Sequence, residues 1–437
     1  MQLTLCHLHV RCWDGADDTI PFGLPPIRFH PVDDGKNVTF TERNLIGTRA
    51  FVRVKDSIST LSTSRTSAST ESSGEPFPLQ HVSSRPKASY RLADFIIHQT
   101  LGTGSFGRVH LVRSKHNLRF YAIKVLSKDK VVKTKQVEHT NNEKTILEGV
   151  QHPFIVNLWG AFQDASNLYM IMDFVPGGEL FTLLRRSGRF PEPVTKFYAA
   201  EVAMALNYLH RLDVVYRDLK PENILLNFDG HIKIADFGFA KRCSVTTWTL
   251  CGTPDYLAPE IVLQQRYTRS VDWYALGVLI FEMLTGFPPY YQPDRNTNIL
   301  YERILQGPSF IRWPAFQPHA TDIILKLMES DAVKRYGKVD YGAGDVFTHP
   351  WFSEVDWDRL YSRKIAAPYL PKLKSEGDAS AFERYPEEEV ASTYGKVCHD
   401  PHAREFPDFE YTSPDTYPPA CQASEAYRCI SPSIARK

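Results

Sequence analysis

LGTGSFGRVHLV, residues 101–112, carries three glycines in the pattern G-x-G-x-x-G, at Gly102, Gly104 and Gly107. Glycine removes the side chain where the backbone must approach another group closely, or where the dihedral angles exclude other residues. A phosphate is the usual group at such a loop, but the pattern also fits a dinucleotide-binding loop or an ordinary mobile turn. The residues that follow the glycines have to decide between these structures.

The chain after the glycines alternates as a strand does. Residues 108–112 alternate polar with apolar side chains, a short polar stretch follows at 114–117, and residues 120–126 (FYAIKVL) predict a second strand. A dinucleotide-binding fold needs a helix directly after the glycines. The sequence therefore predicts a β-hairpin, whose loop can bend back over its own sheet and lay backbone amides across a triphosphate.

Lys124 lies inside the apolar run of the second strand. A lone lysine there is most often a surface residue of an edge strand. The next segment, residues 135–150, predicts a helix in which Glu143 shares one face with Leu147 and Val150. Because an unpaired buried carboxylate is costly, Glu143 needs a cation, and Lys124 is the candidate. A lysine held in this way can direct its ammonium at phosphate oxygens.

A second informative stretch is VVYRDLKPENILLNFDGHIKIADFG, residues 214–238. Residues 224–226 and 231–234 predict two short strands joined by a hairpin turn. The hairpin brings Asn223, just before the first strand, near Asp236, just after the second. Two oxygen ligands suit Mg²⁺, whose remaining positions nucleotide phosphates can fill.

Two charged residues lie on the loop that leads into this hairpin. Asp218 can accept the proton of a hydroxyl that attacks phosphorus, and Lys220 can neutralise the transferring phosphoryl group. Each fragment alone has an ordinary explanation, because Asp and Asn are common turn residues and D-F-G arises by chance. Their order along the chain carries the inference: glycine hairpin, strand lysine, helix glutamate, R-D-x-K-x-x-x-N, D-F-G, and A-P-E at residues 258–260.

In this order the motifs match the signatures of protein kinases, and residues 95–352 resemble a eukaryotic protein kinase domain. The resemblance implies an α+β fold with two lobes. The small, β-rich N-lobe, with one key helix, would cover residues 95–175, and the larger, mainly helical C-lobe residues 176–352. The catalytic loop reads Tyr-Arg-Asp at residues 216–218, a variant that is familiar in the AGC group.

The resemblance assigns roles to the matched residues of the cleft. Asp218, Lys220, Lys124 and Glu143 would form the catalytic set, and Asn223 and Asp236 would hold Mg²⁺. The ATP-binding residues would be those of the glycine loop, the adenine walls and the ribose contact: Leu101, Gly102, Thr103, Gly104, Ser105, Phe106, Gly107, Val109, Ala122, Lys124, Met172, Val175, Glu179 and Leu225. The expected cofactors are thus ATP and Mg²⁺.

Several stretches narrow the resemblance to AGC kinases of the cyclic-AMP-dependent type, among them KQVEHTNNEKTIL, ADFGFAKR and TTWTLCGTPDYLAPE. The resemblance implies that residues 353–411 form a C-terminal tail wrapped over both lobes. Phe382 would close over the adenine, and a hydrophobic F-x-x-F motif at residues 406–409 would dock on the N-lobe. Residues 1–89, rich in Ser and Thr, and 412–437, rich in Pro, are expected to be largely disordered.

The resemblance also implies a regulatory site. Thr249 occupies the position of an activation-loop phosphorylation, and a phosphate there needs cationic partners. Arg217, Lys241 and His139 match the family's positions for that set. For His139 alone, an exposed helix histidine is the more ordinary explanation.

Substrate binding would use acidic residues that pair with arginines before the target serine, and an apolar pocket after it. The matched residues are Glu179, Glu222, Glu282, Leu250, Pro254 and Leu257. The expected substrates are Arg-Arg-x-Ser sequences followed by an apolar residue. Glu282 interrupts an apolar run, and it could instead be the structural partner of some other basic group. Glu260 is expected to pair with Arg335.

Composition limits the partners. The chain has 437 residues, with 51 basic and 50 acidic side chains and a net charge of +1, so nothing indicates binding to nucleic acid or to an anionic membrane. No apolar run is long enough to span a membrane. The seven scattered cysteines indicate reduced thiols and an intracellular protein, in the cytoplasm or also in the nucleus.

Three functional hypotheses follow. The first is a kinase of the cyclic-AMP-dependent type, acting on basic Ser/Thr proteins and inhibited by a cAMP-binding regulatory subunit that contacts Trp248. The second is another AGC kinase with different control. The third is a nucleotide-binding pseudokinase scaffold, against which the intact Lys124, Asp218, Asn223 and Asp236 argue.

Overall fold

The computed structural model describes residues 90–243, 246–249, 251–294, 296–337, 343–387, 394 and 399–414. The chain divides into two units, residues 1–34 with 88–437, and residues 35–87, and all described residues belong to the first. The predictions for residues 1–89 and for Leu250 lie outside the described residues, as does most of the extension predicted to be disordered at 412–437. That prediction is wrong at residue 412, because Tyr411–Thr412 form a short strand.

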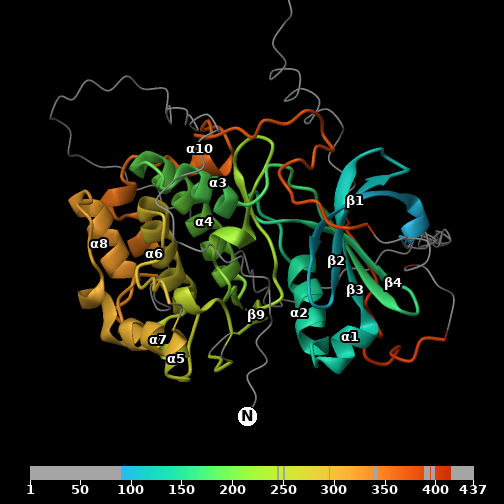
Figure 1. Cartoon of the computed structure of the whole chain (residues 1–437), viewed down its shortest axis with the longest axis horizontal. Helices are drawn as coiled ribbons and strands as arrows, with labels where there is room; N and C mark the ends of the chain where they lie inside the picture. Colours follow the sequence, from blue (N-terminus) through green and yellow to red (C-terminus); the bar gives the residue numbers. More distant parts are fainter. Residues whose placement is uncertain are drawn as a thin grey trace, which may run out of the picture. The chain divides into compact units, whose positions relative to one another are not determined.

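The small lobe is built on an antiparallel sheet (Figure 1). Its strands, in the order β1-β2-β3-β5-β4-β10, have the bounds β1 Phe95–Thr103, β2 Gly107–Ser114, β3 Phe120–Ser127, β5 Asn167–Asp173, β4 Leu158–Gln163 and β10 Tyr411–Thr412. The glycine loop joins β1 to β2, and β2 pairs with β3, so the predicted hairpin is confirmed.

Side chains alternate along β3, as the period of a strand requires. Tyr121, Ile123 and Val125 pack into one cluster on one face of the sheet. Ala122 belongs to a different cluster, on the opposite face. Because Lys124 is two residues from Ala122, it shares that second face.

Two helices follow β3, where the sequence predicted one over residues 135–150. They are α1 (Lys128–Lys133) and α2 (Val137–Glu148). The Ser127 hydroxyl caps α1 by accepting from the Lys130 amide. Lys135 has a φ of 59°, a left-handed conformation that separates the two helices, so α2 cannot begin there.

The large lobe is mainly helical. Its α-helices are α3 Leu180–Ser187, α4 Glu192–Arg211, α5 Pro259–Val262, α6 Ser270–Thr285, α7 Thr297–Gln306, α8 Pro318–Leu327, α9 Gly344–Phe347 and α10 Trp357–Tyr361. Its short strands are β6 Val214–Val215, β7 Ile224–Leu226, β8 Ile232–Ile234 and β9 Lys241–Arg242. Single 3-10 turns, one of them in the small lobe, are η1 Leu92–Asp94, η2 Pro221–Asn223, η3 Pro254–Tyr256, η4 Gly307–Phe310 and η5 Pro350–Phe352.

Helix α6 forms the centre of the large lobe. Every residue from Ser270 to Leu284 is buried, as expected for a helix that is apolar on all sides. Helices α4 and α8 pack against it. The helix ends at Gly286, where φ is 95° and a Cβ atom would lie 2.2 Å from the Gly188 carbonyl oxygen. Its buried carboxylates, Asp272 and Glu282, therefore need partners inside the lobe.

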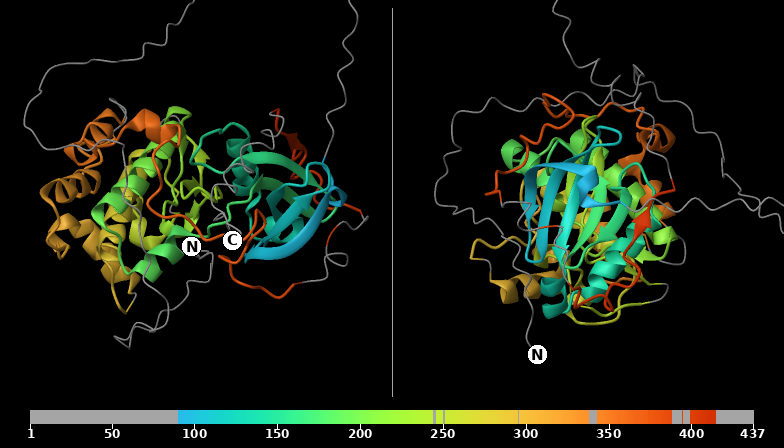
Figure 2. Two further views of the ribbon diagram at one scale, coloured as in Figure 1. Left: turned by 90° about the horizontal axis from the view of Figure 1, so that it is seen from above. Right: turned by 90° about the vertical axis from the view of Figure 1, so that its right-hand side faces the viewer.

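The described part of the tail, within residues 353–414, contacts both lobes (Figure 2). Arg363 lies 3.2 Å from Asp229 on the β7–β8 turn of the large lobe. The ring of Phe382 lies 6.1 Å from that of Phe174, which directly follows β5.

The end of the tail lies against α2 and β4. Phe406 and Phe409 of the hydrophobic motif are both buried. The Lys144 ammonium donates to the Asp408 carbonyl over 2.7 Å. The side-chain NH₂ of Gln163 donates to the Phe406 carbonyl over 2.9 Å. Strand β10 then adds to the edge of the sheet beside β4.

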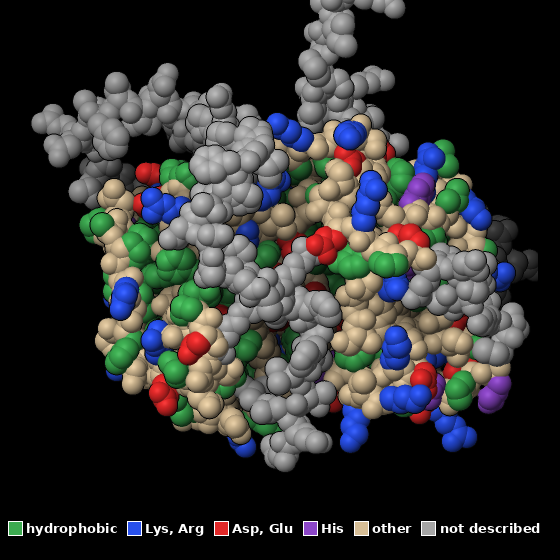
Figure 3. Space-filling model, in the orientation of Figure 1, with side chains coloured by type: hydrophobic (Ala, Val, Ile, Leu, Met, Phe, Trp, Pro, Cys, Tyr) green, Lys and Arg blue, Asp and Glu red, His purple; other side chains and the backbone are tan. Residues whose placement is uncertain are grey.

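Basic and acidic side chains are interspersed over the face drawn in Figure 3. Within the part of the chain that the structure describes, no helix is both long and apolar enough to cross a membrane.

Candidate active site

The three glycines of the loop meet different surroundings. A Cβ atom on Gly107 would lie 1.7 Å from the Val125 carbonyl oxygen, so the packing of the hairpin itself requires this glycine. A Cβ atom on Gly102 would meet nothing within 4 Å, and one on Gly104 would meet only the Gly107 carbonyl oxygen, at 3.9 Å. The first two glycines therefore leave the loop surface open to a ligand.

Lys124 and Glu143 form the ion pair that the sequence predicted, between β3 and α2. The Lys124 ammonium lies 2.7 Å and 2.9 Å from the two Glu143 carboxylate oxygens, and 3.5 Å from Asp236. Burial raises the pKa of Glu143, and Lys124 partly offsets this. Burial alone would lower the pKa of Lys124, but the carboxylates of Glu143 and Asp236 outweigh it and raise that pKa. The ammonium therefore stays charged.

The β7–β8 hairpin brings Asn223 and Asp236 to one place, as predicted. The Ala235 amide donates to the Asn223 carbonyl over 2.8 Å. The Asn223 side-chain NH₂ donates to the backbone carbonyl and to the carboxylate of Asp218, both over 2.8 Å, so its side-chain oxygen points away from them.

Asp236 has a φ of 54°, and its side chain is 41% exposed. Burial raises its pKa, but Lys124 and the Gly238 amide outweigh this effect and hold the pKa below its ordinary value. An ionised carboxylate beside an amide oxygen fits Mg²⁺, which prefers oxygen ligands and takes only one or two from the protein. No cluster of three or more His, Cys, Asp or Glu that could hold a metal occurs among the described residues.

Asp218 is almost completely buried. Its carboxylate lies 2.9 Å from the Lys220 ammonium and accepts from the Thr253 hydroxyl over 3.1 Å. Burial raises the pKa of Asp218, and Lys220 partly offsets the shift. Thr253, which also lies 3.1 Å from the Lys220 ammonium, was not predicted from the sequence, because only the fold brings residue 253 back to the loop.

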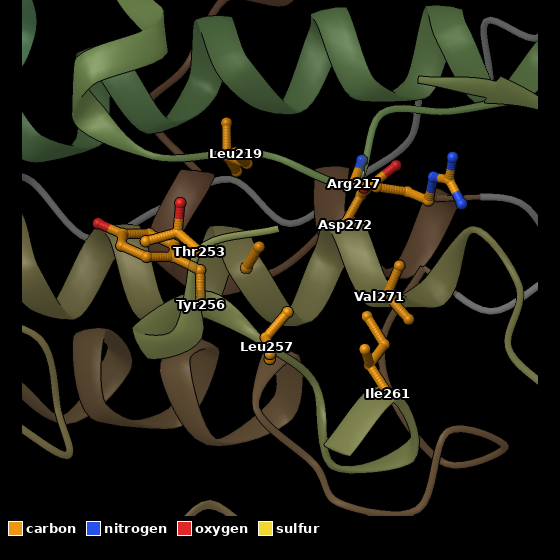
Figure 4. Close-up of a pocket in the computed structure, with 9 residues that line it drawn as sticks. Arg217, Leu219, Thr253, Tyr256, Leu257, Ile261, Val271 and Asp272 are labelled. Carbon is orange, nitrogen blue, oxygen red and sulfur yellow. Dashed lines mark hydrogen bonds between the residues drawn. The ribbon is translucent and has the colours of Figure 1, made fainter. Parts of the chain in front are cut away.

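Helix α6 supports the catalytic loop through the carboxylate of Asp272. The Tyr216 and Arg217 amides donate to the two oxygens of Asp272 over 2.9 Å and 2.8 Å. His210 shares the same carboxylate at 2.8 Å. Arg217 has a φ of 68°, so its backbone needs this support. Figure 4 shows Arg217 and Asp272 on one side of a pocket, with Thr253 and Tyr256 on the other.

The expected adenine walls fall into two adjoining clusters. Leu101 and Ala122 are buried together, and Val109 and Phe382 pack against them. The remaining predicted residues, in the main core, are Met172, Val175 and Leu225. Two residues of the first cluster were not predicted from the sequence. Ala379 belongs to the tail, and Phe174 belongs to the hinge, the segment between the end of β5 and the start of α3.

The other predicted nucleotide contacts lie around the cleft rim. Thr103 ends β1, and Ser105 is exposed at the tip of the loop. Phe106 is half-buried, and its carbonyl accepts from the Ser127 amide over 2.9 Å. Glu179 precedes α3 and forms a β-bridge with Leu225 of β7.

The three predicted partners of Thr249 lie close enough to interact electrostatically. Burial lowers the pKa of His139, and the nearby charges of Arg217 and Lys241 lower it further, against an opposing effect of Glu138. The Tyr267 hydroxyl donates to the Thr249 carbonyl over 2.7 Å and accepts from Arg217 over 3.1 Å. Tyr267, which the sequence did not indicate, therefore links Thr249 to the catalytic loop.

The predicted substrate-binding residues differ in how far their carboxylates are buried. Glu222 is half-buried beside α3, and burial raises its pKa. Glu282 is only 2% exposed, and both its oxygens are engaged, by Arg185 and by the Tyr256 hydroxyl. In this structure the Glu282 carboxylate is therefore occupied by Arg185 and Tyr256, and its pairing with a substrate arginine stays a prediction.

The apolar pocket and the structural ion pair are both in the large lobe. Pro254 begins η3, and Leu257, buried directly after η3, lines the pocket of Figure 4. Arg335 donates to the two Glu260 oxygens over 2.6 Å and 3.0 Å, so the predicted pair of Glu260 and Arg335 is confirmed.

Residues 95–352 match the protein kinase domain family, and the chain belongs to this family. The predicted two-lobed α+β kinase fold is thereby confirmed. Members of the family use ATP as the phosphoryl donor, usually with a divalent metal ion.

Among kinases, the chain is similar to cAMP-dependent ones. It is 57% identical over 325 residues to the cAMP-dependent protein kinase catalytic subunit of Arthrobotrys oligospora, a match that covers 74% of this chain and 62% of that protein. It is 56% identical over 315 residues to cAMP-dependent protein kinase type 3 of Saccharomyces cerevisiae, covering 72% and 78%. It is 53% identical over 336 residues to the cAMP-dependent protein kinase catalytic subunit of Schizosaccharomyces pombe, covering 76% and 64%. The match thus spans less than two thirds of two of these three relatives.

Proposed function

We propose that this protein is a serine/threonine protein kinase of the cyclic-AMP-dependent type, which transfers the γ-phosphate of ATP to Ser or Thr in Arg-Arg-x-Ser-like sequences. The observation that carries the proposal is the proximity of Lys124 to Asp236, 3.5 Å apart, and of Asn223 to Asp218, 2.8 Å apart, with the β7–β8 hairpin joining the two pairs. These are the four functions that phosphoryl transfer needs: a phosphate cation, an acceptor-orienting carboxylate and two metal ligands.

The cleft residues position ATP before the reaction. The amides of the glycine loop cover the phosphates, and Leu101, Val109 and Ala122 enclose the adenine. Lys124, held by Glu143, directs its ammonium at the α- and β-phosphates. Asn223 and Asp236 would hold Mg²⁺, which supplies positive charge to the phosphate oxygens when bound.

Asp218 then orients the acceptor. Its carboxylate would accept a hydrogen bond from the hydroxyl of a substrate serine. It takes that proton as the oxygen attacks the γ-phosphorus and the bond to the β-phosphate oxygen breaks, which releases ADP. Lys220 contacts the γ-phosphoryl group and stabilises the charge on its oxygens. The Thr253 hydroxyl holds the Asp218 carboxylate in place on the side away from Asn223.

Phosphorylation of Thr249 is the proposed activating step. A phosphate at Thr249 would carry about −1.5 to −2 charges into the group formed by Arg217, Lys241 and His139. Because Arg217 precedes Asp218 directly, the same contact would fix the catalytic carboxylate.

Substrate selection follows from the charges at the groove. Glu179 and Glu222 would pair with arginines before the target serine, and Pro254 and Leu257 would receive the apolar residue after it. A cAMP-binding regulatory subunit is the proposed inhibitory partner, and Trp248, 68% exposed, is its proposed contact. We assign the protein to the cytoplasm or nucleus, which fractionation with organelle markers tests.

The test is phosphorylation of an arrayed peptide set, with and without a cAMP-sensitive regulatory subunit. The proposal predicts transfer to Arg-Arg-x-Ser peptides, loss of transfer when both arginines become alanine, and inhibition that cAMP relieves. Inhibition without relief, or transfer to unrelated peptides, would instead support another AGC kinase. Wild-type and Asp218→Asn proteins that both bind ATP but transfer no phosphate would leave only the pseudokinase.

A further inference from the structure

A buried lysine outside the catalytic set joins the two lobes behind the cleft. Lys233 lies in β8, and its side chain is 11% exposed. Its ammonium lies 2.9 Å from the carboxylate of Asp173 and donates to the Ile155 carbonyl over 2.9 Å. Asp173 is the last residue of β5, and Ile155 lies between α2 and β4.

The Asp173 carboxylate is saturated by donors from the same region. The Asn157 amide and side-chain NH₂ donate to it over 3.0 Å and 2.9 Å, and the Trp159 indole NH donates over 2.8 Å. Burial raises the pKa of Asp173, but Lys233 and these hydrogen bonds outweigh it and hold the pKa below its ordinary value. The carboxylate therefore stays ionised and has one fixed orientation.

Backbone hydrogen bonds tie the same segments together. The Ile234 amide donates to the Phe154 carbonyl over 2.8 Å, and the Val156 amide donates to the Ile234 carbonyl over 3.0 Å. The Asp173 amide donates to the Asn157 carbonyl over 3.2 Å. We call Lys233, Asp173, Asn157, Trp159 and Ile155 the Lys233 junction.

The junction lies next to nucleotide-binding residues at both of its ends. Asp173 directly follows Met172, a proposed adenine wall, and Lys233 is three residues before the proposed metal ligand Asp236. A buried ion pair is weak evidence for stability, because an apolar pair of similar volume is often as stable. Its use here is geometric, since one ammonium contacts both the end of β5, at Asp173, and the segment after α2, at Ile155.

We propose that Lys233 and Asp173 are positioning residues, which fix the end of β5 relative to Asp236 and thereby set the affinity for the nucleotide. Neither side chain touches the reacting atoms, so both act through Met172 and Asp236. The inference rests on the proposed function, and it concerns the geometry of the same cleft.

The test compares Lys233→Met with Lys196→Met by calorimetric titration with ADP and Mg²⁺, and by single-turnover transfer at saturating ATP. Lys196 is a matched control, because it is 17% exposed and pairs with Glu354 over 2.9 Å, in a part of the large lobe away from the cleft. We expect Lys233→Met to weaken ADP binding about five- to tenfold, with less than a threefold change in the single-turnover rate. Lys196→Met should change neither quantity.

Two further variants keep the proposal open to contradiction. Lys233→Gln, which retains a donor for the Ile155 carbonyl, replaces Lys233→Met if the latter does not fold. Lys233→Met combined with Asp173→Asn should bind ADP no more weakly than the more affected single variant, because both variants break the same ion pair. Additive losses would overturn the pairing, and unchanged ADP affinity in a folded Lys233 variant would overturn the positioning role.

Amide hydrogen exchange separates this proposal from the proposed function. In Lys233→Met, the amides of Val156 and Asp173 should exchange faster than in wild type, whether or not the protein transfers phosphate. Unchanged exchange would contradict the junction itself. A wild-type protein that binds no nucleotide would instead contradict the proposed function.

Discussion

The ion pair of Glu260 with Arg335 in the large lobe and that of Glu143 with Lys124 in the small lobe are built differently. In the large lobe, Arg335 is fully buried and donates to both oxygens of Glu260. In the small lobe, Lys124 remains 19% exposed and lies against Glu143 on one side and Asp236 on another.

The two cations differ in how many of their hydrogen-bond donors remain available to a ligand. The remaining donors of Arg335 are engaged by backbone carbonyls of Glu329, Ser270 and Ser330. A planar guanidinium with all its donors engaged fixes one geometry and excludes a ligand. The ammonium of Lys124 is a compact charge on a flexible stem, open toward the cleft. One pair is thus suited to structure and the other to binding phosphate.

The largest effect should come from breaking the pair in the cleft. Lys124→Met removes the cation that contacts the phosphates, and we expect kcat/KM to fall about 10²- to 10³-fold, as for the loss of one preorganised donor. The protein should stay folded, because Glu143, whose pKa burial already raises, can take up a proton. Steady-state kinetics with a basic serine peptide measures the loss, and circular dichroism checks the fold. A variant with wild-type kcat/KM would contradict the role of Lys124.

Breaking the pair in the large lobe should lower the stability of the fold and leave kcat unchanged. Arg335→Lys keeps the charge but loses the fork, so one Glu260 oxygen and several carbonyls lose their donors. We expect the free energy of unfolding to fall by about 2–3 kcal/mol. Urea unfolding measures this, and kcat of the folded fraction should stay within about twofold of wild type. A loss of kcat with unchanged stability would reverse the distinction between the two pairs.

Glu282 is a third buried glutamate, and its ionisation should have an effect no larger than that of Arg335→Lys. Burial raises the pKa of Glu282 from its ordinary 4.5 to about 7, with Arg185 and Tyr256 offsetting part of the shift. Since the folded state holds this proton more tightly, the contribution of Glu282 to stability is complete below about pH 4.5 and is lost as the pH rises through about 7.

Glu282→Gln imitates the protonated form and removes this titration. Between pH 5 and pH 8, the free energy of unfolding of wild type should fall by about 2–3 kcal/mol relative to Glu282→Gln. Parallel urea unfolding of both proteins across this range tests the sign. A difference that is constant with pH would mean that Glu282 stays ionised beside Arg185.

Much of the cleft was predictable, because its residues either interrupt an apolar pattern or flank a local turn that the sequence displays. Lys124 and Glu143 each interrupt an apolar pattern, so each demanded a partner, and the structure pairs them. The turn between β7 and β8 fixed the proximity of Asn223 and Asp236 in the same way, since a hairpin closes locally.

The parts that sequence reasoning missed depend on contacts between distant segments. Thr253 reaches Asp218 only because the chain returns through η3, and Asp272 supports the catalytic loop from the centre of α6. Glu282 was expected at the groove, but no local pattern shows that Arg185 lies across from it. The separation of α1 from α2 depends on the left-handed backbone of Lys135, which nothing in a lysine side chain indicates.

The most direct test of the account is a single-turnover transfer experiment with purified wild type and Asp236→Asn, in which Mg²⁺ is titrated from zero at fixed ATP and a basic serine peptide. The account predicts no transfer by wild type without the metal, saturable transfer with it, and, for Asp236→Asn, transfer that is at least about 10²-fold slower at wild-type saturating Mg²⁺. Transfer by wild type that is independent of Mg²⁺, or an Asp236→Asn variant with the wild-type titration curve, would contradict the claim that Lys124, Asp218, Asn223 and Asp236 converge on the terminal phosphoryl group.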